Sequence, residues 1–404
     1  MVFNLNEFLT AISFALDFVE IDILGANTNH GKRTAYMALK IAEELGFSSE
    51  ELHDIAALAI LHDNGVSEKS LFESLNTEGS SKISELELIK EHCTIGEENI
   101  KKYPFLTDVR NVIKYHHERY DGSGFFSLNR DEIPVMSQII EMADVLEMDF
   151  DIQNNSLDTQ NNIFRFIKEQ ENRMFSTEIA NAFRNAAQNK AFWMDLKNLS
   201  IDSAIRKSTP QYVVDLPFEK IQDITQIFSK IIDSKSKYTQ RHSRDLSEKV
   251  AIMADFYGIK DDERLKLIIA ANLHDIGKLA VPNAILDRPN KLTKYEFEVI
   301  KEHTYYTRMA LQEIKGFEEI TEWASNHHEK LNGLGYPYGK NTKDLDFNSR
   351  LVACLDIYEA LTEERPYRES LKHGEAMNIL NGMKYDGLID SKITDDIGHV
   401  FKSI

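Results

Sequence analysis

Histidines and aspartates occur along this chain in two sets that share one order and nearly one spacing. Ten of the 13 histidines belong to these sets. His30 precedes His242 by 212 residues, and His92 precedes His303 by 211. The first set is His30, His62, Asp63, His92, His116, His117 and Asp144, and the second is His242, His274, Asp275, His303, His327, His328 and Asp356. Because chance does not place seven such residues twice in one order, the pattern predicts a tandem repeat of one domain.

The segments between these residues also repeat. Two pairs of segments align closely: ELHDIAALAILHDNG at 51–65 with DERLKLIIAANLHDIGK at 262–278, and HHERYDGSGFF at 116–126 with HHEKLNGLGYP at 327–337. Proline disfavours helix in the residue before it, so Ser208-Thr209-Pro210 suits a linker between the copies. We therefore expect one domain over residues 1–208 and a second over residues 209–404.

The apolar pattern is helical almost throughout. Apolar residues recur three and four positions apart in stretches such as Ile221, Ile224 and Phe228, which is typical of a helix with one buried face. No run alternates apolar and polar residues convincingly, as a half-buried strand would. We predict an all-α fold of two tandem helical bundles. In the first copy we expect a loop over residues 151–162 and a helix over 163–199, with Trp193 packing the two domains together.

Charge and composition exclude some classes of partner. The formal net charge of −19 argues against DNA or RNA polymers, which need a basic surface to displace counterions. A small anionic ligand needs only local positive charge and stays compatible. No apolar run reaches about 18 residues and no signal peptide is recognisable, so we expect a cytoplasmic protein. Pairing with a second copy or with a signalling protein stays open.

The two cysteines, Cys93 and Cys354, cannot build a disulfide framework. Each lies beside a member of the repeated sets: Cys93 follows His92, and Cys354 precedes Asp356 by two residues. We expect both to be small core residues, and an influence on a metal ion is the alternative.

The repeated residues suit a pair of metal ions. Imidazoles and carboxylates bind Fe, Mn and Zn, and a bridging carboxylate can hold two ions about 3.5–4 Å apart. His274 and Asp275 follow the apolar run 267–271, and a buried charged pair is rare unless it is paired or metal-bound. Hydroxide shared by two metals is a strong nucleophile that can attack phosphorus while cations stabilise the added charge. The second set therefore predicts a two-metal hydrolytic site.

Residues 210–404 resemble an HD-GYP domain, the branch of the HD metal-dependent phosphohydrolases that opens cyclic dinucleotides. The resemblance rests on five segments: YTQRHS, LHDIGKLAVPNAIL, KLTKYEFEVIKEH, HHEKLNGLGYP and RLVACLDIYEALTEERPYR. It implies HD-type helical bundles with two divalent metal ions in the C-terminal domain, with Fe or Mn favoured. It also implies hydrolysis of cyclic di-GMP to linear pGpG, and in some members on to GMP.

The resemblance also implies roles for single residues. One metal would be held by His242, His274, Asp275 and Asp356, and the other by His303, His327 and His328, with Asp275 bridging. Lys278 would contact the scissile phosphate or the attacking hydroxide, and Tyr336 would line the guanine pocket. Arg365 and Arg368 would bind phosphate through their planar donors. Some members carry Glu four residues before the first His, which supports a third metal; Tyr238 stands there in this chain, so two metals are expected.

The first copy retains all seven metal-type residues but differs around them. Val66 stands at the position of Lys278, and Phe125 at that of Tyr336 within Gly124-Phe125-Phe126. The positions of the two RPYR arginines are occupied by Gln153 and Ser156. Three interpretations stay open: a metal-bearing, inactive domain that senses or supports its partner, a structural relic without metal, or an enzyme that hydrolyses something else, such as a different nucleotide or a linear product. We expect a regulatory domain and leave metal in this copy open.

We expect the chain to be a cyclic dinucleotide phosphodiesterase whose C-terminal domain uses a metal-bridging hydroxide to attack phosphorus in cyclic di-GMP. Two alternatives stay open. The motifs report on phosphate and metals and little on the bases, so cyclic GMP-AMP is a second substrate. A non-catalytic module that senses cyclic dinucleotides or redox state belongs to a different class. The complete ligand set together with Lys278 favours the enzyme.

Overall fold

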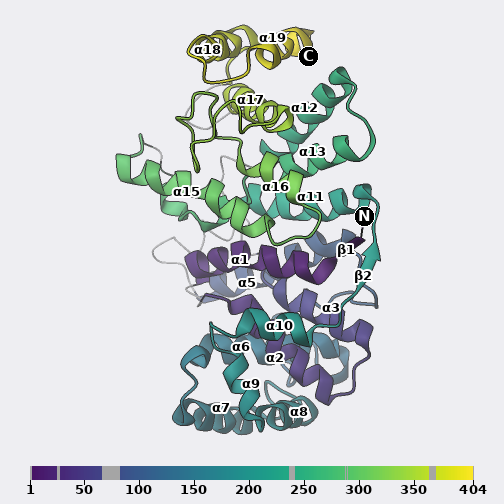
Figure 1. Cartoon of the computed structure of the whole chain (residues 1–404). Helices are drawn as coiled ribbons and strands as arrows, with labels where there is room; N and C mark the ends of the chain where they lie inside the picture. Colours follow the sequence, from purple (N-terminus) through teal and green to yellow (C-terminus); the bar gives the residue numbers. More distant parts are fainter. Residues whose placement is uncertain are drawn as a thin grey trace. The chain divides into compact units, whose positions relative to one another are not determined.

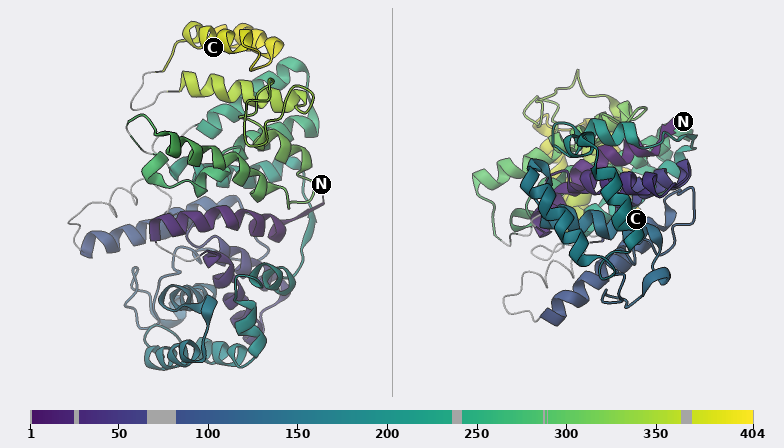
Figure 2. Two further views of the ribbon diagram at one scale, coloured as in Figure 1. Left: turned by 60° about the vertical axis from the view of Figure 1, so that its left-hand side comes forward. Right: turned by 90° about the horizontal axis from the view of Figure 1, so that it is seen from below.

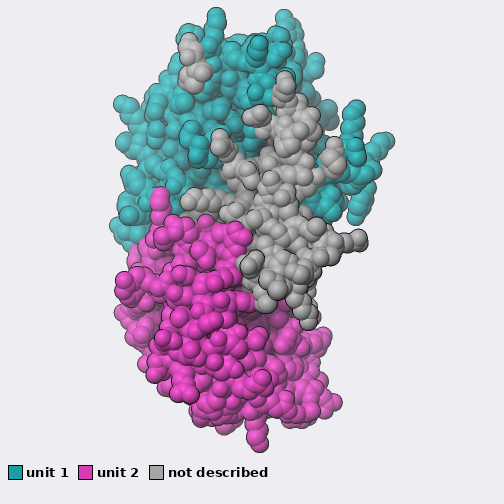
Figure 3. All heavy atoms as spheres, turned by 180° about the vertical axis from the view of Figure 1, so that it is seen from behind, with its two compact units in different colours: residues 1–3, 215–404 teal, residues 4–214 magenta. Residues whose placement is uncertain are grey.

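The described part of the protein is predominantly helical, as the computed structural model in Figure 1 shows, and the predicted all-α class is confirmed. The structure describes residues 2–24, 28–65, 82–235, 242–286, 288, 290–363 and 370–403. Two compact units are coloured separately in Figure 3: Asn4–Val214, and Met1–Phe3 together with Asp215–Ile404. Among the helices within these ranges, none combines the length and apolar character that crossing a bilayer requires.

The N-terminal unit is built around one central helix. Its helices are α1 (Leu5–Leu24), α2 (His30–Glu44), α3 (Ser49–Ile60), α5 (Lys82–Asn99), α6 (Val135–Asp149), α7 (Leu157–Gln170), α8 (Thr177–Ala187), α9 (Lys190–Asp195) and α10 (Ile201–Ser208). Strands β1 (Val2–Asn4) and β2 (Val213–Asp215) pair in a small sheet, and the division between the units falls within each of them. Helix α2 contacts α1, α3, α6, α8 and α10, and its residues 35–39 are buried. This helix therefore forms the core of the unit.

The division between the units falls at residue 214, after the boundary expected at 208. Helix α10 ends at Ser208, before Pro210, as the helix-breaking effect of proline predicts. The chain then continues as extended backbone into β2 and stays with the N-terminal unit up to Val214. A linker composition thus marks the end of the helix and not the end of the unit.

Residues 157–195 form three helices where the sequence predicted a loop followed by one long helix. Helix α7 begins at Leu157 because the Ser156 hydroxyl accepts a hydrogen bond from the backbone N–H of Thr159, at 3.1 Å. Ser176 and Asn189 cap α8 and α9 in the same way. The prediction was wrong because Ser and Asn suit helix caps as well as loops.

Trp193 belongs to the core of the N-terminal unit, which corrects the prediction that it packs the two domains together. Its ring centroid lies 5.1 Å from that of Phe192 and 6.2 Å from that of Phe164. Its indole N–H donates to the carbonyl oxygen of Ala187 at 2.8 Å. The buried ring and the satisfied N–H stabilise this unit from within.

The C-terminal unit is also arranged around one helix. Its elements are α11 (Phe218–Lys235), α12 (His242–Tyr257), α13 (Asp261–Leu273), the 3-10 turn η4 (Ile276–Ala280), α14 (Asn283–Leu286), α15 (Lys294–Leu311), α16 (Glu318–Ser325), α17 (Phe347–Thr362), α18 (His373–Tyr385) and α19 (Ser391–Val400). Helix α13 contacts α11, α12, α16 and α17. Helices α18 and α19, yellow in Figure 2, pack against each other and against α17.

Local sequence signals define where the site-bearing helices begin. Thr293 and Glu296 form a capping box at the start of α15, and Asp346 accepts from the backbone N–H of Ser349 at the start of α17. The apolar face of α12, including Leu246 and Val250, is fully buried. These helices therefore hold their inward faces, and the polar residues on them, in defined positions.

Candidate metal centres

All seven residues of the second set lie together inside the C-terminal unit. Five segments contribute: His242 begins α12, His274 and Asp275 follow α13, His303 lies on α15, His327 and His328 follow α16, and Asp356 lies on α17. All are buried except His328, whose side chain is 28% exposed. The structure thus brings together residues that are up to 114 positions apart, from 242 to 356.

These residues form two groups that share one carboxylate. Ligand atoms of His242, His274 and Asp356, here metal position 1, lie within 4.8 Å of one another. The same holds for His303, His327 and His328, here metal position 2. Asp275 faces both groups: its Oδ2 lies 3.1 Å from Nε2 of His274, and its Oδ1 lies 3.5 Å from Nε2 of His303. A carboxylate placed in this way can bridge two metal ions.

Three of the imidazoles are oriented by hydrogen bonds to the backbone. The Nδ1–H groups of His274, His303 and His327 donate to carbonyl oxygens three residues earlier, at 2.7, 2.5 and 2.6 Å. With the proton on Nδ1, each Nε2 carries a lone pair that faces the centre of the site. The Nε2 atoms of His303 and His327 are only 3.1 Å apart. Two lone pairs at this separation repel each other, and a bound cation removes the repulsion.

Beside the facing imidazole lone pairs, the buried oxygen Oδ1 of Asp275 is a second indication that the site fits a metal ion. This atom has no hydrogen-bond partner among the described residues. An orphaned carboxylate oxygen in the interior is costly unless a cation or donor meets it. The donor set of imidazoles and carboxylates suits divalent Fe, Mn or Zn. The residues present therefore fit a pair of divalent metal ions.

Electrostatics differ between the two positions. Burial lowers the pKa of His303 to about 3 and that of His328 to about 4, so position 2 presents neutral imidazoles, the form that binds metal. Burial would also lower the pKa of His242, but the carboxylates of Asp356 and Glu363, with oxygens 3.2 and 3.5 Å from its two ring nitrogens, outweigh burial and raise this pKa to about 10. A metal ion at position 1 would therefore compete with a proton for His242.

Three described side chains beside the cluster are partly exposed: His328, Lys278 and Tyr336. The side chains of His328 and Lys278 are 28% and 21% exposed. Lys278 Nζ donates to Oδ2 of Asp275 at 2.5 Å, and the Tyr336 ring lies 5.0 Å from that of His328. A ligand that enters here meets a cation and an aromatic ring before the metal positions. Four residues named in the sequence predictions lie outside the described residues: Val66, Tyr238, Arg365 and Arg368.

The first set assembles in the same way inside the N-terminal unit. Ligand atoms of His30, His62 and Asp144 lie within 4.8 Å of one another. Asp63 again faces two groups, with Oδ2 3.4 Å from Nε2 of His62 and Oδ1 3.3 Å from Nε2 of His92. Within the part of the chain that the structure describes, its Oδ1 also has no hydrogen-bond partner. The residues of this copy therefore fit metal ions by the same test.

Sequence reasoning missed two carboxylates on α6 that contact the N-terminal cluster. Glu147 Oε2 lies 2.5 Å from Nδ1 of His30, while its Oε1 accepts from Nε of Arg33 at 2.8 Å. Glu141 Oε2 lies 3.1 Å from Nδ1 of His117, and burial raises the pKa of Glu141 to about 8. Both stand three residues from the predicted ligand of α6, so all three share one face of the helix. That spacing is the signal that could have found them.

A glycine after each His-Asp pair allows the turn to approach the next helix. A Cβ atom on Gly277 would lie 2.0 Å from the carbonyl oxygen of His303, and one on Gly65 would lie 2.2 Å from that of His92. Neither position has room for a side chain. The glycines therefore let the two segments that carry metal-type residues pack backbone to backbone.

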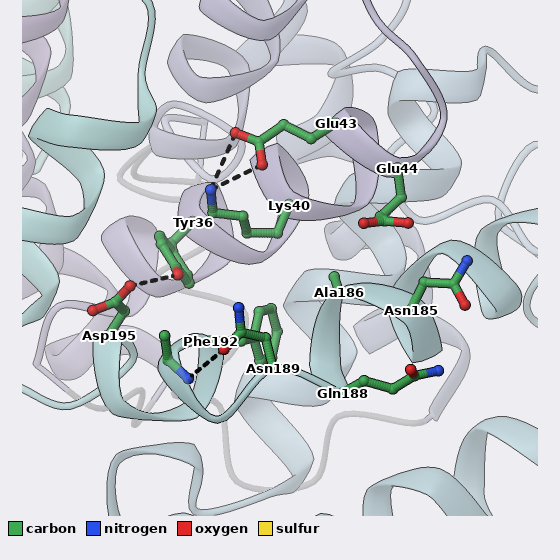
Figure 4. A pocket seen from close by; sticks show the side chains of 11 residues that line it. Tyr36, Lys40, Glu43, Glu44, Asn185, Ala186, Gln188, Asn189, Phe192 and Asp195 are labelled. Atoms are coloured by element: carbon green, nitrogen blue, oxygen red, sulfur yellow. Dashed lines mark hydrogen bonds and ion pairs between the residues drawn. The ribbon is translucent and has the colours of Figure 1, made fainter.

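A pocket of about 530 Å³ lies elsewhere in the N-terminal unit, between α2, α8 and α9 (Figure 4). Its wall includes Tyr36, whose hydroxyl donates to Asp195 at 2.8 Å, and Lys40, which pairs with Glu43. These polar groups satisfy one another, and the metal-type residues do not line the pocket. It is separate from the metal cluster.

Comparison with known proteins defines the class. A family model described as HD domain matches residues 19–150 and 226–393, one segment in each unit, and the chain belongs to this family. It is 30% identical to the 3'3'-cGAMP-specific phosphodiesterase 1 of Vibrio cholerae serotype O1, over 98% of this chain and 91% of that protein. It is 30% identical to a cyclic di-GMP phosphodiesterase of Pseudomonas aeruginosa, over 40% of this chain and 39% of that protein.

A solved structure shares the whole fold. The crystal structure of a cyclic GMP-AMP specific phosphodiesterase of V. cholerae matches with a TM-score of 0.71 and 24% identity, over 100% of this chain and 99% of that chain. The predicted resemblance to the HD-GYP branch is confirmed, since the relatives are cyclic dinucleotide phosphodiesterases of this kind.

Proposed function

We propose that the C-terminal unit is a metal-dependent phosphodiesterase that opens 3'3'-cyclic GMP-AMP, and that the N-terminal unit regulates it. The observation that carries the proposal is Asp275, whose two oxygens face two separate groups of buried imidazoles. Divalent ions at metal positions 1 and 2 would lower the pKa of water and polarise a phosphoryl oxygen. The protein orients the imidazoles for them through the backbone hydrogen bonds described above.

Lys278 would supply positive charge to the substrate phosphate. It ends the His-Asp segment, its Nζ lies 2.5 Å from Asp275, and it is partly exposed at the open side of the site. A fixed cation beside the phosphate stabilises the negative charge that hydrolysis adds to phosphorus. The corresponding residue in the N-terminal copy is Val66, which has no charge to offer.

Replacing Lys278 with methionine should lower kcat by about 100-fold, the range for loss of one charge-stabilising donor. Metal content should stay unchanged because Lys278 supplies no ligand. Metal analysis and initial rates on the same preparation check both points. Lys266→Met is the matched control, since Lys266 makes a surface ion pair with Glu319 and should leave kcat unaltered. A Lys278→Met variant with normal kcat would contradict the assigned role.

The choice of cyclic GMP-AMP rests on which relative covers which part of the chain. The relative that aligns with 98% of this chain, and so with both units, is named for 3'3'-cGAMP. The P. aeruginosa relative, named for cyclic di-GMP, aligns with 40%. The tandem arrangement is therefore shared with the protein named for the hybrid dinucleotide, and cyclic di-GMP is the second substrate.

The substrate is tested by incubating the full-length protein, loaded with Mn²⁺ or Fe²⁺, with each cyclic dinucleotide. We expect kcat/KM for cyclic GMP-AMP to exceed that for cyclic di-GMP by about tenfold or more, the effect of one hydrogen bond to a base edge. Equal or faster opening of cyclic di-GMP would favour the second substrate. Tight binding without turnover in either metal would favour a non-catalytic sensing module.

The proposed regulatory role of the N-terminal unit rests on the residues that surround its metal-type histidines and aspartates. The Phe125 ring lies 5.6 Å from that of His117, where the C-terminal unit places Tyr336 beside His328. The metal-type residues are thus retained beside an aromatic side chain that lacks a hydroxyl. A unit that retains the metal cluster without the phosphate-binding groups is suited to sensing or supporting its partner.

A further inference from the structure

We infer that the N-terminal unit binds a metal ion through a thiolate, in a site that Cys93 completes. The site comprises His92, Cys93, His116 and His117, whose ligand atoms all lie within 4.8 Å of one another. Cys93 is fully buried, and its Sγ lies 3.5 Å from Nε2 of His92. Thiolate and imidazole donors in a four-residue set are the ligands of structural Zn²⁺ sites.

The surroundings of these side chains independently indicate a cation. Oδ1 of Asp63, which accepts no hydrogen bond from any described residue, lies 3.3 Å from Nε2 of His92 and 3.7 Å from Nε2 of His116. Nδ1–H of His116 donates to the carbonyl oxygen of Ile113, so its Nε2 carries a lone pair. That atom faces Nε2 of His92 at 3.4 Å. The negative oxygen of Asp63 and the lone pair of His116 repel each other. A positive ion bound between them would remove this repulsion.

The C-terminal copy has a different residue at the position of Cys93. Thr304 follows His303 as Cys93 follows His92, and its hydroxyl donates to the backbone oxygen of Lys301 at 3.0 Å. Metal position 2 therefore has three imidazoles and a shared carboxylate, while the N-terminal position has a sulfur donor in addition. The sulfur fills a coordination place that water or substrate needs in a catalytic site. This is a physical reason for the N-terminal copy not to hydrolyse phosphodiesters.

Glu141 is a second residue that sets the N-terminal position apart. Its carboxylate, 2% exposed, lies 3.1 Å from Nδ1 of His117. The corresponding residue of α17 is Ala353, which cannot make such a contact. A carboxyl group that contacts a ligating imidazole fixes the orientation of the ring. In the N-terminal unit, the contact from Glu141 would therefore help to retain a metal ion. In the C-terminal unit, Ala353 provides no such contact.

The donor set favours zinc over the metals expected at the C-terminal positions. Thiolate is a soft ligand that binds Zn²⁺ more strongly than Fe²⁺ or Mn²⁺. On binding, the thiol of Cys93 releases its proton to solvent and the resulting thiolate sulfur bonds to the metal. The chain would therefore carry a zinc ion in its N-terminal unit, separate from the ions that serve hydrolysis.

Cobalt substitution of the full-length protein tests this site directly. A thiolate bound to Co²⁺ gives an intense near-ultraviolet charge-transfer absorption that imidazole and carboxylate ligands do not give. We expect this band in the wild type and its loss in Cys93→Ser. Cys93→Thr, which introduces the residue of the C-terminal counterpart, should also lose the band and about one zinc ion per chain. It should keep its helical circular dichroism, which shows that the variant is folded.

Cys354→Ser is the matched control. Cys354 is the second of the two cysteines in the chain; it is buried, and its thiol contacts Thr394. The band should persist in this variant. Three results would overturn the proposal: cobalt binding by the wild type without the band, a band that survives in folded Cys93→Ser or Cys93→Thr, or a band that Cys354→Ser removes. None of these results depends on which cyclic dinucleotide the C-terminal unit opens.

Discussion

Replacing Asp275 with alanine should lower the hydrolysis of cyclic dinucleotide by at least about 1000-fold, more than the loss of one charge-stabilising donor. Asp275 is the carboxylate that faces both metal positions, so its removal takes a ligand from each. The variant should also bind less metal in its C-terminal unit. Product formation, followed over a long incubation, and metal analysis of the purified protein measure the two effects.

Asp63→Ala is the matched control, because Asp63 takes the same place in the N-terminal cluster. It should change the rate by less than about 100-fold, the upper range of coupling between distinct sites. Loss of hydrolysis as complete as in Asp275→Ala would contradict the assignment of catalysis to the C-terminal unit. A rate identical to that of the wild type would contradict the regulatory role of the N-terminal unit.

Replacing Gly277 with alanine should lower the free energy of unfolding by about 3 kcal/mol, the upper part of the range for overpacking. The added Cβ would lie 2.0 Å from the carbonyl oxygen of His303 and 2.6 Å from the backbone nitrogen of Thr307. These are backbone atoms of α15, which cannot turn aside as the end of a flexible side chain can. Thermal unfolding followed by circular dichroism should show a lower Tm, together with weaker metal binding as His303 shifts.

Gly382→Ala in α18 provides the comparison, since a Cβ there would meet no atom within 4 Å. In a helix interior alanine is more stable than glycine by about 0.5–1 kcal/mol, so this variant should gain stability. If Gly277→Ala and Gly382→Ala unfold at the same temperature, close approach to α15 is not the reason for glycine at residue 277.

Much of the fold and of the site could be predicted from residue types alone. The helical class followed from apolar spacing such as Ile221, Ile224 and Phe228, which α11 buries. The members of each repeated set do meet in the structure, as their shared order along the chain predicted. The errors arose where one residue type serves two structural roles. Ser156 caps a helix instead of lying in a loop, and Trp193 is buried in the core of its own unit.

The sequence by itself determined the repeat of the histidine and aspartate sets and the helical class. It also determined that the first copy has Val66 where the second has Lys278. Each of these depends on residue identity and on spacing along the chain. Only the tertiary structure decided that the two oxygens of Asp275 face different groups, and that Cys93 joins three imidazoles where Thr304 bonds to its own helix. The physical reason is that these contacts depend on the directions of side chains on helices that are distant in sequence. The packing of the helices determines those directions, and the spacing of residues along the chain does not reveal them.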